Sequence, residues 1–219
     1  MPHTHTIKIL IAEDHNIVRH GLRQSLSQEE DMMVVAEADN GRKAVELASE
    51  HNPDVIVMDV SMPDMNGIEA TRQILKINPD IKIIALSMHS EKQYVLSMVK
   101  AGARGYLLKT NLFEELLTAI RTVIDGNVFL SPEITEHIVK SAINPNDDSE
   151  LLAFYTLTSR EREVLQLIAE GRPHSDIADC LFISKKTVDS HRFNIMHKLN
   201  MDNIPALTKF AVKHGITSL

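Results

Sequence analysis

Five short runs of apolar, largely β-branched residues alternate with longer amphipathic segments over the first 127 residues, and this alternation restricts the possible folds most strongly. The intervening segments carry apolar residues at spacings of three and four, which is typical of helices packed through one face. Such alternation predicts an α/β fold, a doubly wound, five-stranded parallel sheet with helices on both faces. We expect strands at 7–12, 33–36, 55–58, 81–86 and 105–108, and helices near 16–27, 41–51, 67–77, 91–101 and 112–125.

The pattern changes after residue 127. A short helical candidate and a stretch rich in Pro, Asn and Asp come next, and we interpret residues 128–155 as a linker. The remaining chain has helical periodicity only. The sequence therefore predicts a sheet domain at 1–127 and an all-α four-helix domain at 156–219, with helices near 158–170, 175–182, 185–199 and 204–214.

Composition excludes several classes of protein. Of 219 residues, 43% are hydrophobic and 24% are charged, which argues against disorder and fibrous folds. No apolar run approaches the ~20 residues that cross a bilayer, and the start of the chain does not resemble a signal peptide. We therefore expect a cytoplasmic protein with no membrane partner. The single cysteine, Cys180, cannot form an internal disulfide.

Acidic residues follow two of the predicted strands. Glu13 and Asp14 end the first strand, and Asp59 ends the third. In a doubly wound sheet these ends meet at one edge, where ligands bind. Two like charges ~4 Å apart repel by about 4 kcal/mol at an effective dielectric near 20, so the cluster needs raised pKa values or a cation, most plausibly Mg²⁺. Ser87 and Lys109, after the fourth and fifth strands, complete a set suited to phosphoryl transfer.

The same residues resemble the receiver domain of two-component response regulators, whose CheY-like sheet has the strand order 2-1-3-4-5. The matching text is Ile-Ala-Glu13-Asp14-His, Val-Ile-Val-Met-Asp59-Val-Ser-Met-Pro63-Asp-Met-Asn-Gly67, Ile-Ala-Leu-Ser87-Met-His and Ala101-Gly-Ala-Arg-Gly-Tyr106-Leu-Leu-Lys109.

The resemblance implies roles for particular residues. Asp59 would accept a phosphoryl group from a histidine kinase, and Ser87 and Lys109 would contact its oxygens. Tyr106 would be a switch residue that turns inward when Ser87 moves. Mg²⁺ would be held by Glu13, Asp14, Asp59 and the backbone carbonyl of Ser61.

The third helix of the C-terminal domain has an outward face that suits DNA. Its N-terminal end carries two lysines and the positive end of the helix dipole. The net charge of residues 156–219 is only +2, from nine basic and seven acidic residues, so charge alone leaves a solvated helix face equally acceptable. Thr158 and Glu161 form a predicted capping box at the start of the first helix.

Residues 156–215 resemble the LuxR-type helix-turn-helix. The matching text includes Leu157-Thr-Ser-Arg-Glu161-Arg-Glu-Val-Leu165 and Ile183-Ser184-Lys-Lys-Thr187-Val188-Asp-Ser-His191-Arg-Phe-Asn-Ile195-Met-His-Lys198-Leu199. The resemblance makes the third helix a recognition helix for double-stranded DNA and residues 205–212 a dimerisation surface. The predicted DNA contacts are Ser184, Lys185, Lys186, Thr187, Asp189, Ser190, Arg192, Phe193 and Lys198.

Together the two halves resemble response regulators of the NarL/FixJ subfamily. The expected function is transcription regulation by a homodimer on DNA, controlled by phosphorylation of Asp59, with no enzyme activity beyond assisting the receiver's own phosphoryl transfer and dephosphorylation. Two alternatives stay open. An aspartate-dependent phosphohydrolase usually has a second acid two residues after its nucleophile, where this chain has Ser61. The other alternative is a DNA-binding regulator whose receiver carries out no phosphoryl transfer.

Overall fold

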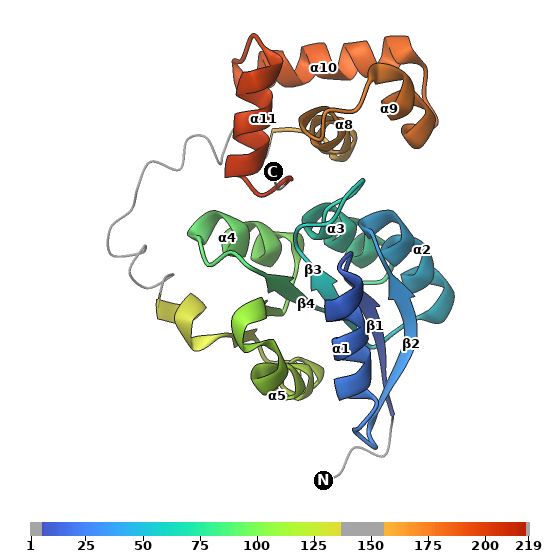
Figure 1. Ribbon diagram of the computed structural model, residues 1–219, viewed down its shortest axis with the longest axis vertical. Helices are drawn as coiled ribbons and strands as arrows, with labels where there is room; N and C mark the ends of the chain where they lie inside the picture. Colours follow the sequence, from blue (N-terminus) through green and yellow to red (C-terminus); the bar gives the residue numbers. More distant parts are fainter. Residues whose placement is uncertain (1–5, 137–155, 218–219) are drawn as a thin grey trace. The chain divides into compact units, whose positions relative to one another are not determined.

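The computed structural model describes residues 6–136 and 156–217, and the chain divides into two compact units, Met1–Ile143 and Asn144–Leu219 (Figure 1). The first unit is a parallel sheet with the strand order β2-β1-β3-β4-β5-β6. Its strands are β1 (Ile7–Ala12), β2 (Met32–Ala38), β3 (Val55–Asp59), β4 (Lys82–Ser87), β5 (Gly105–Leu108) and β6 (Phe129–Leu130).

Helices cover both faces of the sheet because its side chains alternate between two apolar cores. Leu10 of β1 packs in the core under α2 (Gly41–His51), α3 (Gly67–Ile77) and α4 (Lys92–Ala101). Its neighbours Ile9 and Ile11 pack in the core under α1 (Asn16–Leu26) and α5 (Leu112–Ile124). A 3-10 turn, η1 (Lys109–Asn111), joins β5 to α5. The predicted doubly wound α/β fold is thus confirmed.

The sheet has one strand more than the five predicted. β6 pairs in parallel with β5, with Leu130 opposite Tyr106, and the backbone N–H of Ser131 donates to the Tyr106 carbonyl at 3.1 Å. Two residues give no periodic pattern, which is why the sequence did not reveal this strand. Ile134, in a helical stretch that follows, is fully buried in the same core as Tyr106. Residues at the start of the predicted linker therefore pack with the sheet unit.

The second unit contains the four predicted helices within its described residues: α8 (Ser159–Ala169), α9 (His174–Leu181), α10 (Lys185–Leu199) and α11 (Ile204–Lys213). Apolar side chains from all four make one core. The capping box of Thr158 and Glu161 is present, and Ser184 caps α10 through the backbone N–H of Thr187. The short loops and caps make α9 and α10 a compact helix-turn-helix.

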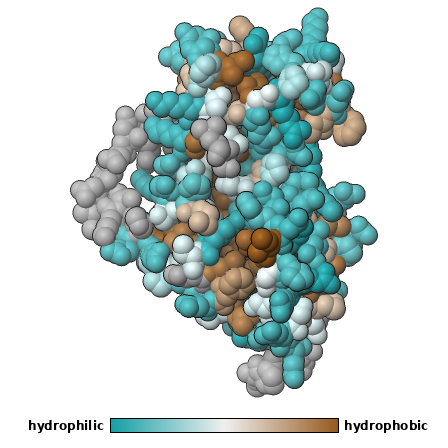
Figure 2. Space-filling view, viewed as in Figure 1, coloured by the Kyte–Doolittle hydropathy of each residue, from teal (hydrophilic) through white to brown (hydrophobic). Residues whose placement is uncertain are grey.

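Within the described residues, none of the helices is both long enough and apolar enough to cross a membrane. Most of the visible surface is hydrophilic, and apolar residues show as separate patches on both units (Figure 2).

Candidate phosphoacceptor pocket and DNA-binding helix

The carboxyl ends of β1 and β3 bring the predicted acidic residues together. Glu13 is fully buried and Asp59 is 2% exposed. One ligand atom from each of Glu13, Asp14, His15 and Asp59 lies within 4.8 Å of the others. The loop after β3 is shaped by Gly67, where an added Cβ would lie 2.0 Å from the Asp59 carbonyl oxygen. The fold thus concentrates three carboxyl groups at the edge where the sequence predicts a ligand site.

Lys109 is the cation that enters this cluster from the end of β5. Its Nζ lies 2.8 Å from Asp59 Oδ2 and 2.8 Å from Glu13 Oε2. Register explains its position, because Ser87 on β4 is paired with Leu108, the residue before Lys109. The backbone N–H of Ser61 donates to Asp59 Oδ1 at 3.2 Å. The ammonium group is therefore in direct contact with the predicted phosphoacceptor.

Burial changes the protonation of this pocket. Burial and the neighbouring Glu13 carboxyl group raise the pKa of Asp59 to about 7, although Lys109 acts in the opposite direction. Burial tends to lower the pKa of Lys109, but the charges and hydrogen bonds of Asp59 and Glu13 together outweigh it and the pKa is raised. Three carboxyl groups thus lie around one ammonium group in this pocket.

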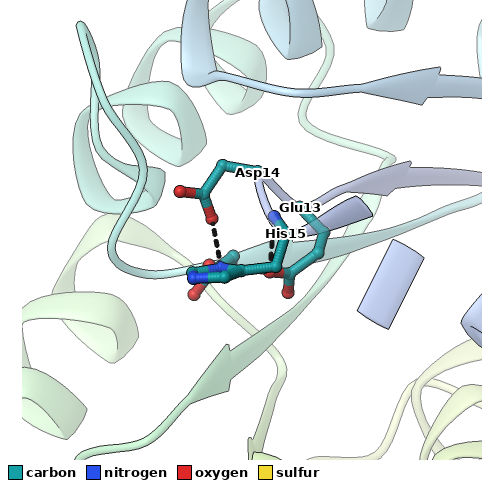
Figure 3. A group of neighbouring side chains, drawn as sticks. Glu13, Asp14 and His15 are labelled. Carbon is teal, nitrogen blue, oxygen red and sulfur yellow. Dashed lines mark hydrogen bonds and ion pairs between the residues drawn. The ribbon is translucent and has the colours of Figure 1, made fainter. Parts of the chain in front are cut away.

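His15 is a member of this cluster that sequence reasoning missed. Its Nδ1 lies 2.8 Å from Asp14 Oδ1 and 3.1 Å from Glu13 Oε1 (Figure 3). The charge of Asp14 is the largest of the effects that raise the pKa of His15. The signal in the sequence was its position directly after Glu13 and Asp14. As its side chain is 68% exposed, His15 lies on the solvent side of the cluster.

Ser87 and Tyr106 are linked through the loop after β4. The backbone N–H of His89 donates to Ser87 Oγ at 3.0 Å, and the Tyr106 hydroxyl donates to the His89 carbonyl at 2.8 Å. Tyr106 is fully buried, and burial raises its pKa. The His89 ring stacks on Tyr94 with ring centroids 4.3 Å apart. The side chains of Ser87 and Tyr106, the two predicted switch residues, are therefore both hydrogen-bonded to the backbone of His89. The Tyr106 side chain points inward in this structure.

The predicted DNA-contacting residues lie on α10 and its cap. Val188, Ile195 and Leu199 are buried, as the helical spacing predicts. The exposed members of the predicted set are Ser184, Lys185, Lys186, Asp189, Ser190, Phe193 and Lys198, and Thr187 and Arg192 are half-buried.

Two of these side chains have partners that the sequence did not reveal. The Nζ of Lys198 donates to Glu161 Oε2 at 2.7 Å and to the Thr156 carbonyl at 3.2 Å. The Asp189 carboxylate lies 3.0 Å from Nδ1 of His174 on α9. Both contacts join residues from different helices, so the linear pattern gave no indication of them.

The doubly wound sheet with its acidic pocket, together with a helix-turn-helix, defines a class of two-domain regulators, and comparisons with known proteins agree. Residues 9–121 match the family model for the response regulator receiver domain, and residues 155–211 match the model for bacterial regulatory proteins of the luxR family.

Relatives match over nearly the whole chain. The oxygen regulatory protein NreC of Staphylococcus epidermidis is 41% identical, covering 94% of this chain and 97% of that protein. The response regulator GacA of Pseudomonas aeruginosa is 36% identical, covering 96% and 97%. A crystal structure of a LuxR-family two-component response regulator from Aurantimonas has 35% identity and a TM-score of 0.61, covering 64% of this chain and 99% of its own.

The structure of an RcsB–DNA complex is also similar, with 27% identity, a TM-score of 0.60 and coverage of 95% of this chain and 98% of its own. The chain therefore belongs to the LuxR-type response regulators, transcriptional regulators of two-component systems that consist of a receiver and a DNA-binding domain.

Proposed function

We propose that Asp59 accepts a phosphoryl group from a histidine kinase and that this modification controls DNA binding by the C-terminal unit. The position of the Asp59 carboxylate carries the proposal: it is buried at the carboxyl edge of the sheet, 2.8 Å from the Lys109 ammonium group. A carboxylate in such a pocket is a competent nucleophile toward phosphorus. In the transfer, a bond forms between an Asp59 oxygen and phosphorus as the bond from phosphorus to the donor imidazole nitrogen breaks.

The residues around Asp59 have separate tasks in this step. Lys109 neutralises charge on the phosphoryl oxygens, and the Ser87 hydroxyl donates a hydrogen bond to one of them. The Ser61 N–H, 3.2 Å from Asp59 Oδ1, orients the nucleophile. Catalysis here is positioning and neutralisation of charge, since the donor supplies the reactive bond.

The donor set suits Mg²⁺. Hard divalent cations prefer oxygen ligands, and the pocket offers carboxylates of Glu13, Asp14 and Asp59, with the Ser61 carbonyl predicted as a fourth. The raised pKa of Asp59 supports the same view, because burial and the Glu13 carboxyl group both disfavour its charged form, and a bound cation would oppose both effects. When bound, Mg²⁺ would neutralise charge between the acceptor and the incoming phosphoryl group.

The hydrogen bonds that link Ser87 to Tyr106 through the backbone of His89 would transmit the effect of phosphorylation to the rest of the receiver. If Ser87 Oγ turns toward a phosphoryl oxygen, the bond from the His89 N–H at 3.0 Å weakens, and the His89 carbonyl that holds Tyr106 shifts with it. The modification would then favour one of two receiver conformations.

The output is binding of double-stranded DNA through α10 in the major groove, as a homodimer on two like half-sites. Exposed lysines at the N-terminal end of α10 suit contacts with phosphate. The similarity to an RcsB–DNA complex supports this part of the proposal. We also propose that the receiver domain extends beyond residue 127, at least to residue 136, because β6 and Ile134 pack with it.

Intact mass spectrometry tests the phosphoacceptor. After incubation with Mg²⁺ and a small-molecule phosphodonor, we expect one added phosphoryl group on the wild type and on the control Asp80→Asn, and none on Asp59→Asn. Asp80 is exposed and outside the pocket. Addition to Asp59→Asn would refute the assignment. Release of inorganic phosphate from a phosphate monoester over many turnovers, with no phosphoryl group retained on the protein, would favour a phosphohydrolase.

A further inference from the structure

Asp189 is an unusual residue for a surface that approaches a polyanion. It follows the buried Val188 on α10, and its side chain is 55% exposed. Lys185, one helical turn earlier, and the adjacent Lys186 are also exposed, so the carboxylate lies on the part of α10 that carries the lysines. On the function proposed above, this part of α10 enters the major groove, where a carboxylate is repelled by phosphates.

The carboxylate is held in place by a neighbouring helix. Nδ1 of His174, the first residue of α9, lies 3.0 Å from Asp189 Oδ1. The side chain of His174 is one-third exposed, so most of the imidazole is buried against the helix domain. One oxygen of Asp189 thus faces α9, and because the side chain is 55% exposed, a partner outside the domain can reach the carboxylate.

The chemistry of base edges limits what that oxygen can bind. An ionised carboxylate only accepts hydrogen bonds. In the major groove guanine presents two acceptors and thymine presents one, while adenine places its N7 acceptor next to its amino donor. Cytosine alone presents an amino donor with no acceptor on the same base.

We propose that Asp189, positioned by His174, selects cytosine at one position of each DNA half-site. The inference rests on the DNA-binding function proposed above and names the base that one residue of α10 reads. Asp189 is the specificity residue, and His174 is a positioning residue that acts through it.

Selection from a pool of double-stranded DNA with randomised positions tests this reading. The full-length protein is first incubated with Mg²⁺ and the phosphodonor, and bound sequences are compared for the wild type, Asp189→Ala, His174→Leu and His174→Gln. The matched control is Asp179→Ala, which removes the same charge from an exposed position on α9.

We expect the wild type and Asp179→Ala to enrich one cytosine per half-site, with a preference on the order of tenfold over the other bases. Asp189→Ala should lose the preference at that position only. His174→Leu should weaken it, whereas His174→Gln, which keeps a side-chain N–H donor, should retain most of it. The variants that lose the preference should keep their ability to bind DNA and their specificity elsewhere.

An unchanged sequence preference in Asp189→Ala would overturn the proposal and leave Asp189 as a partner of His174 only. An equal loss of the cytosine preference in Asp179→Ala would also overturn the proposal, because the preference would then depend on the net charge of the domain. If the wild type enriched no sequence, the DNA-binding function itself would be refuted together with this reading.

Discussion

At the scale of single residues, the Asp59 carboxyl group lies between two opposing influences. Burial and the Glu13 carboxyl group favour its protonated form, while the Lys109 ammonium group favours the ionised form. The sequence predicted that Glu13, Asp14, Asp59, Ser87 and Lys109 would lie at one edge of the sheet. It could not predict which groups touch, because those contacts depend on side-chain packing between strands that are far apart in the chain.

In the absence of a metal ion, the stability of the protein should depend on the protonation of Asp59. The pKa of Asp59 is about 7 in the folded state and ~3.9 when unfolded, so the folded state binds more protons between these values. Stability from this group is present below about pH 4 and is lost as pH rises to about 7. Asp59→Asn should therefore unfold at a higher temperature than the wild type at pH 8 with a chelator present, by an amount on the order of several degrees.

The difference in unfolding temperature between Asp59→Asn and the wild type should be smaller at pH 5 than at pH 8. Thermal unfolding followed by circular dichroism at the two pH values measures it. Mg²⁺ at pH 8 should raise the unfolding temperature of the wild type and have less effect on Asp59→Asn, since the variant lacks one of the proposed ligands. A variant less stable than the wild type at pH 8 would contradict this view of the pocket.

The Lys198–Glu161 pair should make stability depend on pH in the opposite direction. Burial tends to raise the pKa of Glu161, but hydrogen bonds from Lys198 and Thr158 outweigh it and lower the pKa. The stability this provides is present above the unfolded pKa of ~4.3 and is lost as pH falls through the lower folded value. Lys198→Met should reduce the free energy of unfolding by about 1 to 2 kcal/mol at pH 7.

Denaturant titration at two pH values tests this. Lys209→Met, which replaces an exposed lysine on α11, should leave stability within about 0.5 kcal/mol of the wild type. The deficit of Lys198→Met should shrink below pH 4. A deficit that is the same at pH 7 and pH 3 would show that packing, rather than the ion pair, is lost.

At the scale of elements, hydrophobic periodicity and caps predicted five strands and the four helices of the second unit, because each has a repeating apolar face or a capping residue. β6 was missed since two residues show no period. The end of α9 was also incompletely predicted. Phe182 ends that helix in the left-handed conformation, with φ of 53°, and its side chain is 95% exposed.

Phe182 yields a prediction about this helix end. A residue with a Cβ atom costs about 1 to 2 kcal/mol in the left-handed region, and glycine avoids most of this cost. Phe182→Gly should therefore raise the free energy of unfolding by about 1 kcal/mol. Phe193→Gly, which changes an exposed residue inside α10, should lower it by about 1 kcal/mol. Urea titration measures the free energy of unfolding of both variants. A Phe182→Gly variant less stable than the wild type would contradict this explanation of the helix end.

At the scale of the whole molecule, the change from alternating to purely helical periodicity predicted two domains. It placed the end of the first at residue 127, because the residues that follow contain too few apolar positions to show a pattern. Ile134 is nevertheless fully buried, and Ser131, also buried, donates a hydrogen bond to a carboxylate oxygen of Glu115.

Truncation tests where the first domain ends. A fragment 1–127 should be less stable than a fragment 1–136 by about 2 to 4 kcal/mol, since it lacks the burial of Ile134 and the pairing of β6. Urea unfolding of the two fragments measures the difference, and fragment 1–136 with Ile134→Ala should fall between them. Equal stability of the two fragments would place the end of the domain at residue 127.

The central claim is that phosphorylation of Asp59 changes DNA binding. The most direct test is a titration of DNA carrying a site selected by the protein, with and without the phosphodonor, for the wild type and Asp59→Asn. We expect the phosphodonor to change the affinity of the wild type by about 5- to 150-fold and to leave that of Asp59→Asn unchanged. Equal affinities of the wild type in both states, with phosphorylation verified by mass, would contradict it.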